Sequence, residues 1–397
     1  MVRYSIDELT EDMVLGESIF LPTGELLLAS GFKIKERYKD RLKELGYSSI
    51  LVEVEGTEEA KPETIVSEEV QRKMYVEIEA ASKNLSNSVK EIHKYSTEEI
   101  KNILHENRAH LNKFILNTGM TKTLHDFIDE IMSQSSIVLN LSALKKAKPG
   151  FLSHALNVTI TSLCIGKKYR FSYEELRQLG IGALNYDMGL VALPGELHEK
   201  KHFEYSPEEI KIYKQHTVIG FLMLTQNQAI PATSSSVALQ HHEKENGSGY
   251  PQGLSGDNRP PLKDFSRKNL INRFAQIVAV ANTYDSFISG RSQEMIDPIS
   301  AKDAIKEIIK KSGTDLNSDI VRTLCTMVPL YPVGARIRIT RSPLSQVDGY
   351  VGVVAKDNPE NLENPQIILY ETRNHQKIKP ILLDLSKHSG YGVELLV

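Results

Sequence analysis

Residues 241–254 read HHEKENGSGYPQGL, and the interpretation of the whole chain starts from this stretch. Two adjacent histidines and a glutamate offer imidazole and carboxylate groups, which bind divalent first-row metals. Adjacent residues of a helix point about 100° apart, so both histidines can face one site only near its rim. The glycines that follow permit unusual backbone angles, and Pro251 fixes the direction of the chain. The stretch therefore predicts a tight loop beside a candidate metal site.

The composition indicates a globular protein. The chain has 397 residues, enough for two or three domains, with 40% hydrophobic and 25% charged residues. A net charge of -3 gives no bulk electrostatic case for binding nucleic acid. Cys164 and Cys325 lie far apart and match no thiol-metal spacing, which favours a reducing compartment. We find no signal-peptide core and no apolar run of membrane-spanning length, and we expect a cytoplasmic protein.

Other candidate ligands lie in segments with helical periodicity. His154 and His216 each occur within such a segment, and Asp187 follows another. A lone histidine on a helix is more often structural or exposed than a ligand, so none of these residues is specific by itself. The helical segments that we predict around them are 151–169, 173–184, 206–228, 231–242, 268–288 and 300–311. The fold class is therefore mainly α.

The flanking regions differ in character. Residues 1–55 predict a small α/β module, with a hairpin over 18–29 that turns at 22–24, a helix over 35–45 that stops at Gly46, and a strand over 50–54. A linker at 56–66 and a helical connecting region at 67–136 follow. The connecting helices either close the core of the next domain or form a hairpin or the seam of a homodimer. That next domain is expected at 137–330, and a C-terminal β module at 331–397, with β runs at 335–340, 349–355, 366–371 and 378–384.

The run from His241 to Leu254 resembles the signature of the HD-GYP family, His-His-Glu followed by Asp-Gly-x-Gly-Tyr-Pro-x-Gly-Leu. Asn246 stands where the family usually has Asp. The resemblance extends over about residues 145–330. It implies an all-α phosphohydrolase fold with two or three metal ions, often iron or manganese, in a helical cleft. It also implies hydrolysis of cyclic di-GMP to pGpG or GMP. The stretch 258–270 is longer than usual in the family and is expected to reshape the mouth of this cleft.

The resemblance assigns roles to individual positions. It implies metal ligands at His154, Asp187, His216, His241 and His242, with Asp187 also in the catalytic position. It implies substrate contacts at Arg291, Gly249, Tyr250 and Pro251. Five family positions are altered: Gly150 replaces Glu, Tyr186 replaces His, Leu190 replaces Lys, Asn282 replaces Asp, and Glu294 replaces a basic residue.

These replacements weaken both metal and substrate binding. A two-metal site needs anionic ligands, whereas Asn282 offers only a neutral carbonyl oxygen. Tyr186 can ligate Fe(III) as a phenolate, but an ordinary tyrosine pKa near 10 opposes this with Zn or Mn. The loss of Lys at Leu190 and of a basic residue at Glu294 removes positive charge that a cyclic dinucleotide would meet. We expect the remaining ligands to hold one divalent metal, or two weakly.

The sequence therefore predicts a degenerate HD-GYP protein of bacterial cyclic di-GMP signalling that binds or regulates, with weak or no hydrolysis. Its expected partners are cyclic di-GMP or a related phosphoester, and a diguanylate-cyclase or adaptor protein. The first alternative is an active metal-dependent phosphodiesterase with a remodelled site that hydrolyses cyclic di-GMP. The second alternative is a helical domain whose histidines are merely structural.

Overall fold

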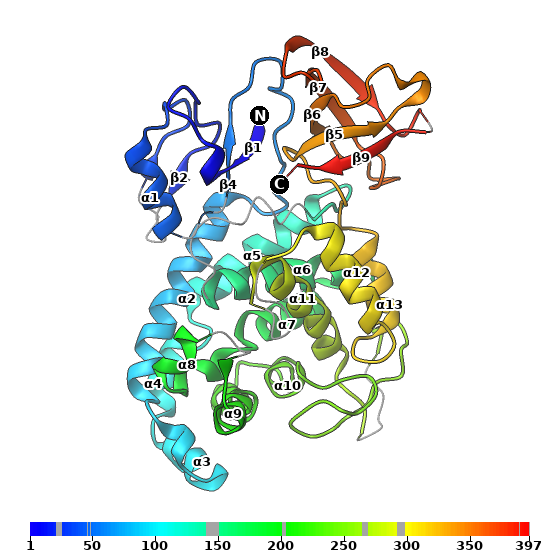
Figure 1. Cartoon of the computed structure of the whole chain (residues 1–397). Helices are drawn as coiled ribbons and strands as arrows, with labels where there is room; N and C mark the ends of the chain where they lie inside the picture. The colour runs from blue at the N-terminus through cyan, green and yellow to red at the C-terminus, as the bar shows by residue number, and fades with distance from the viewer. Residues whose placement is uncertain are drawn as a thin grey trace. The chain divides into compact units, whose positions relative to one another are not determined.

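The structure is a computed structural model that describes residues 1–396 except 21–25, 46, 48, 140–150, 201–203, 264–268, 292–297 and 389. The chain forms two compact units, each assembled from separate stretches of sequence (Figure 1). The first unit contains residues 1–65, 136–150 and 326–397, and the second contains 66–135 and 151–325. None of the described helices combines the length and the apolar character that crossing a membrane requires.

The first unit begins with two short antiparallel strand pairs. β1 (Val2–Ser5) pairs with β4 (Ser49–Val52), and β2 (Ile19–Phe20) pairs with β3 (Leu26–Leu28). The η1 turn (Ile6–Glu8) and helix α1 (Glu36–Glu44) complete this part. The predicted hairpin over 18–29 is confirmed by β2 and β3, whereas its turn at 22–24 and the helix stop at Gly46 lie outside the described residues.

A five-stranded antiparallel sheet completes the first unit. Its order is β8-β7-β6-β5-β9, and the four predicted β runs correspond to β5 (Arg336–Arg341), β6 (Val351–Lys356), β7 (Gln366–Glu371) and β8 (Lys377–Asp384). The sequence analysis missed β9 (Gly392–Leu395), which is only four residues long. The Arg3 N–H donates to the Gly334 carbonyl at 2.8 Å, and Arg336 pairs with Glu8 at 2.7 Å. These contacts join both ends of the chain in one unit.

The second unit is helical, which confirms the expectation of a mainly α chain. Helices α6, α7 and α11 lie at its centre, and α2, α9, α10, α12 and α13 surround them (Figure 1). The helices are α2 (Glu68–Ser88), α3 (Thr97–Glu106), α4 (Arg108–Phe114), α5 (Thr118–Ser133), α6 (Phe151–Lys168), α7 (Tyr173–Asn185), α8 (Gly195–Glu199), α9 (Pro207–Leu224), α10 (Ala232–Gln240), α11 (Arg273–Ser289), α12 (Ala301–Lys311) and α13 (Ser318–Cys325). The 3-10 turns η2 (Ile92–Lys94) and η4 (Met188–Ala192) connect some of them.

Three of the predicted helix boundaries between residues 151 and 311 differ by two residues or more from those observed, and the others differ by at most one. The helix predicted over 268–288 begins at Arg273, because the Asn272 side chain accepts the N–H groups of Phe274 and Ala275. The helix predicted over 206–228 ends at Leu224, and Thr225 caps it. The helix predicted over 231–242 ends at Gln240. His241 is therefore the cap residue of α10, and His242 lies in the turn that follows.

Candidate metal centre

Four side chains from three parts of the second unit meet in one cluster. Asp187 precedes η4, His216 lies in α9, and His241 and His242 follow α10. One ligand atom from each residue lies within 4.8 Å of the others. Asp187, His216 and His241 are buried, and His242 is partly exposed. The turn at the end of α10 thus brings both adjacent histidines to one point, as a regular helix would not.

Backbone carbonyls orient two of the imidazole rings. The Nδ1 atom of His216 lies 2.6 Å from the Tyr213 carbonyl oxygen, and the Nδ1 atom of His241 lies 3.0 Å from the Ala238 carbonyl oxygen. Because a carbonyl oxygen only accepts, Nδ1 is the donor in both rings, and the Nε2 lone pair of each neutral ring points into the cluster. The two Nε2 atoms lie 3.3 Å apart. Outer hydrogen bonds of this kind typically orient metal-binding histidines.

The carboxylate of Asp187 completes an arrangement of acceptor atoms. Its Oδ1 lies 3.4 Å from the Nε2 atoms of both His216 and His241, yet this buried oxygen has no hydrogen-bond partner among the residues that the structure describes. Burial raises the pKa of Asp187, and positive charge on the neighbouring imidazoles of His241, His216 and His154 would lower that pKa below its usual range, but neutral rings do not supply this charge. A buried anion that faces two lone pairs is costly unless a cation lies between them. The three imidazoles and the carboxylate therefore fit one divalent metal.

His154 lies beside this cluster but is engaged elsewhere. Its Nδ1 lies 2.5 Å from Asp285 Oδ2, and its Nε2 lies 2.7 Å from Asn282 Oδ1. Asp285 is held in place by Asn157, whose amide donates to Oδ1 at 2.8 Å. His154 is not among the four residues whose ligand atoms converge. His154, which the family resemblance implies as a metal ligand, therefore directs its Nε2 at the amide of Asn282, where the family usually has Asp.

Tyr186 is a second replaced position, and its hydroxyl also points to Asn282. The hydroxyl donates to Asn282 Oδ1 at 3.3 Å, and the ring meets the His241 ring edge-on, with centroids 4.8 Å apart. Burial, with a smaller effect from the Asp187 charge, raises the pKa of Tyr186 well above its usual value. Tyr186 is therefore a neutral hydrogen-bond donor at neutral pH.

The glycine-rich loop, residues 247–256, packs against the turn that carries the two adjacent histidines. The buried Glu243 carboxylate accepts the N–H groups of Gln252 at 2.7 Å and Leu254 at 2.8 Å, which closes the loop. A Cβ atom at Gly249 would lie 2.5 Å from the Glu243 Cα and the His242 carbonyl oxygen, so the close approach requires glycine. The Tyr250 ring stacks on the His242 ring, with centroids 4.7 Å apart and planes 15° apart.

A cavity of about 180 Å³ borders the cluster. His154, Asp187, His241, His242 and Asn282 line it, together with the cationic side chains of Arg291, Lys244 and Lys311. Lys244 pairs with Asp315 at 2.8 Å. The sequence analysis did not single out Lys244 or Lys311, because nothing in their local sequence indicates that α12 faces the histidine turn.

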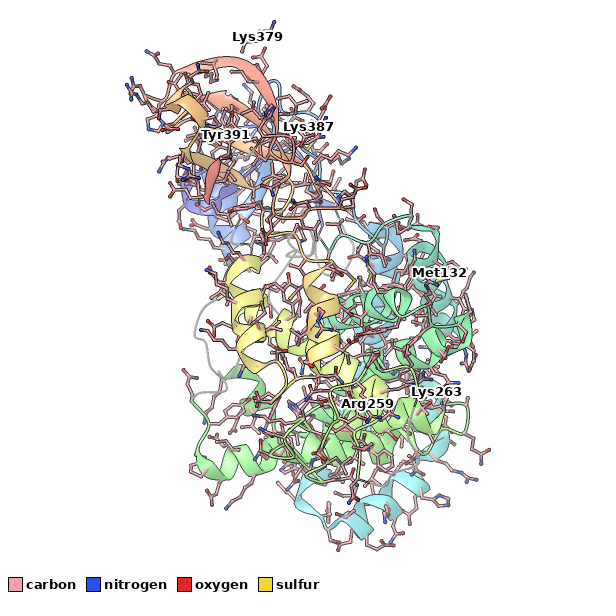
Figure 2. The ribbon with its side chains drawn as sticks, turned by 90° about the vertical axis from the view of Figure 1, so that its right-hand side faces the viewer. Met132, Arg259, Lys263, Lys379, Lys387 and Tyr391 are labelled. Carbon is pink, nitrogen blue, oxygen red and sulfur yellow. The ribbon has the colours of Figure 1, made fainter. Side chains whose placement is uncertain are left out.

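The remaining implied positions are placed as follows. Gly249, Tyr250 and Pro251 do not line this cavity in the described part of the chain, and Leu190 is buried within η4. Gly150 and Glu294 lie outside the described residues. The long stretch 258–270 contributes to a separate cavity of about 240 Å³, between α10 and the start of α11. Its exposed Arg259 and Lys263 are labelled in Figure 2.

Comparisons with known proteins agree with this architecture. Residues 139–320 match the family model described as "HD domain". The chain is 25% identical over 267 residues to a cyclic di-GMP phosphodiesterase of Pseudomonas aeruginosa, which covers 66% of this chain and 59% of the relative. It is 34% identical over 158 residues to a cyclic di-GMP phosphodiesterase of Thermotoga maritima, covering 40% of this chain and 39% of that relative.

Further similarities cover different shares of the chain. The cyclic di-GMP phosphodiesterase response regulator RpfG of Xanthomonas campestris is 34% identical over 129 residues, which covers 32% of this chain and 30% of the relative. This chain thus matches less than two thirds of the length of each of these relatives. A solved HD-GYP-type protein from Bdellovibrio bacteriovorus aligns with 81% of this chain and 97% of its own length, at 18% identity and a TM-score of 0.45.

Proposed function

We propose that the chain is an HD-GYP-type protein, with its HD domain over residues 139–320, and that it acts in cyclic di-GMP signalling as a binding or regulatory protein with weak or no hydrolysis. The contact between His154 Nε2 and Asn282 Oδ1 carries this proposal. It occupies a nitrogen that a second metal ion would need, and it puts a neutral amide where the family has a carboxylate.

One divalent metal would be held by Asp187, His216, His241 and His242. The orphaned Asp187 Oδ1 and the inward Nε2 lone pairs support this assignment. Iron and manganese are the metals that the family resemblance implies. A bound divalent ion supplies Lewis acidity and lowers the pKa of a coordinated water. Hydrolysis by a two-metal mechanism needs a second ion about 3.5–4 Å away, and this chain has lost two of the side chains that would bind it.

The ligand proposed for the cavity is a phosphate group of cyclic di-GMP or a related phosphoester. The side chains of Arg291, Lys244 and Lys311 line the cavity, and cationic groups recognise phosphate oxygens. Asp315 also lines the cavity and pairs with both lysines, so Arg291 is the main candidate for a phosphate contact. The cavity of about 180 Å³ is smaller than pockets of roughly 300–1,000 Å³ that enclose drug-sized ligands. A phosphate would therefore enter while the bases stay outside. The exposed parts of such a ligand would be available to a diguanylate-cyclase or adaptor protein.

The alternative function is a slow phosphodiesterase with a remodelled site. The intact cluster of four ligand residues favours it, because a single metal can also activate water beside a bound phosphoester. In that case Asp187 would hold the metal and Arg291 would orient the phosphate.

Metal content and cyclic di-GMP turnover, measured on one sample purified without chelators, test the proposal. We expect one equivalent of metal by elemental analysis, loss of that metal in His241→Ala, and retention in His105→Ala, whose side chain is exposed on α3. Calorimetry is expected to show binding of cyclic di-GMP with turnover close to background. Two equivalents of metal, with a turnover that His241→Ala abolishes, would overturn the proposal in favour of the alternative.

A further inference from the structure

The structural support of Asp187 extends to a residue outside the matched HD domain. We propose that His93, in η2, is a positioning residue that fixes the geometry of the metal cluster through η4. The inference rests on the proposed metal site. Residues 68–133 fold into the same compact unit as the helices of the HD domain, although the family model begins only at residue 139.

One end of η4 is tied to the cluster itself. Asp187 is the residue before η4, and its carbonyl accepts the Leu190 N–H at 2.9 Å. A Cβ atom at Gly189 would lie 2.0 Å from the His216 carbonyl oxygen and 2.7 Å from the Gly220 nitrogen. The backbone of η4 therefore lies directly against the turn of α9 that carries His216, and the two ligands are positioned by one backbone contact.

The other end of η4 is held by His93. The Nδ1 atom of His93 lies 3.2 Å from the Ala192 carbonyl oxygen, and since a carbonyl only accepts, His93 donates. Ala192 is fully buried, and only 9% of the His93 surface is exposed. A buried carbonyl that loses its donor is left unpaired at a cost in free energy, so this contact is a specific anchor. Helix α2 also packs against η4.

Because η4 is short, the contact between His93 and Ala192 can affect the position of Asp187 in the metal cluster. Only four residues separate Ala192 from Asp187, and all five residues of η4 are buried. A displacement of the Ala192 backbone is therefore expected to displace Asp187 as well, because the buried residues between them leave little room for the chain to adjust. Metal sites require their ligands to lie within about 0.5 Å of the productive geometry. The helices before the HD domain thus set the position of its carboxylate ligand.

Co²⁺ titration with visible absorption spectra tests the inference, because the ligand-field spectrum reports coordination geometry. His93→Leu removes the donor, His93→Asn keeps an N–H donor at the position of Nδ1, and His105→Leu is the matched exposed control from α3. We expect His93→Leu to weaken Co²⁺ binding about 10- to 100-fold, as supporting residues of metal ligands do, and to change the spectrum. Affinity and spectrum should recover in His93→Asn and stay unchanged in His105→Leu.

Equal weakening in His93→Leu and His93→Asn, or a wild-type affinity and spectrum in His93→Leu, would overturn the inference. Should His93→Leu fail to fold, His93→Met takes its place, because its side chain has no N–H donor. Wild-type protein that binds no Co²⁺ would refute the metal site instead. Hydrogen exchange of residues 188–192 then decides the inference independently: faster exchange in His93→Leu than in His93→Asn supports it, and equal exchange overturns it.

Discussion

Gly189→Ala is the substitution that most directly probes how the two ligand-bearing elements fit together. The added methyl group would lie 2.0 Å from the His216 carbonyl oxygen, whereas ordinary contacts begin at 3.4 Å. The backbones of η4 and α9 would have to separate by about 1.4 Å, because no flexible side chain is available to move aside. This displacement exceeds the roughly 0.5 Å that a metal site tolerates. Asp187 and His216 would no longer reach one ion.

The expected magnitudes follow from this overlap. Overpacking typically costs about 1–3 kcal/mol, and a clash between backbones lies at the upper end. For a unit of this size about 3 kcal/mol lowers the melting temperature by roughly 6–12 °C. We also expect metal affinity to fall at least about tenfold, which a competition titration against a coloured chelator measures.

Gly195→Ala is the matched control for this substitution. Gly195 begins α8, and a Cβ atom there would meet no atom of the described residues within 4 Å. We expect its melting temperature and metal affinity to equal those of the wild type or to rise slightly, because alanine favours helices over glycine. If Gly189→Ala behaved like Gly195→Ala in both assays, the close packing of η4 on α9 and the reasoning built on it would be refuted.

Two further predictions concern the neighbourhood of the site. Asn282→Asp restores an anionic oxygen beside His154, so elemental analysis should show metal content rising from one equivalent toward two, and an unchanged single equivalent would contradict the role given to Asn282. Burial, with a smaller contribution from Asp257, raises the pKa of Glu245 above its ordinary value of 4.5. The ionised carboxylate therefore destabilises the folded state at pH values above the folded pKa, and this destabilisation disappears as the pH falls to 4.5. Glu245→Gln, which keeps an acceptor for the Asn258 N–H, should therefore melt higher than the wild type at pH 7 and equal to it near pH 4. A constant difference across that range in a fluorimetric melting series would exclude titration of Glu245 as the cause.

The sequence predicted the helical fold because its signals are local. The run 241–254 carries its own loop chemistry, and the helix starts at Ser172 and Ser206 are capping boxes that the structure contains. The start of α11 was misplaced although Asn272 is itself a cap signal, because the preceding segment also has apolar residues at helical spacing. Local patterns therefore located the helices more reliably than their ends.

The details of the site depend on contacts that no local pattern encodes. His154 is paired with Asp285 and Asn282, which lie 131 and 128 residues further along the chain. Nothing near His154 indicates that its Nε2 would face an amide instead of the cluster. The anchoring of Ala192 by His93, 99 residues earlier, is equally invisible in sequence. Such contacts arise from helix packing, which spacing alone does not determine.

The joining of both chain ends in the first unit determines where the gene can be cut for expression. Val2 and Ala60 are fully buried in one cluster with Val353, Ile368 and Tyr370 of the terminal sheet. A fragment that stops before residue 331 would leave the apolar partners of that sheet facing water at the other end of the chain, a surface prone to aggregation. A soluble fragment should therefore retain both ends or omit both, and one that omits both should begin near residue 66 so that α2 and His93 are kept.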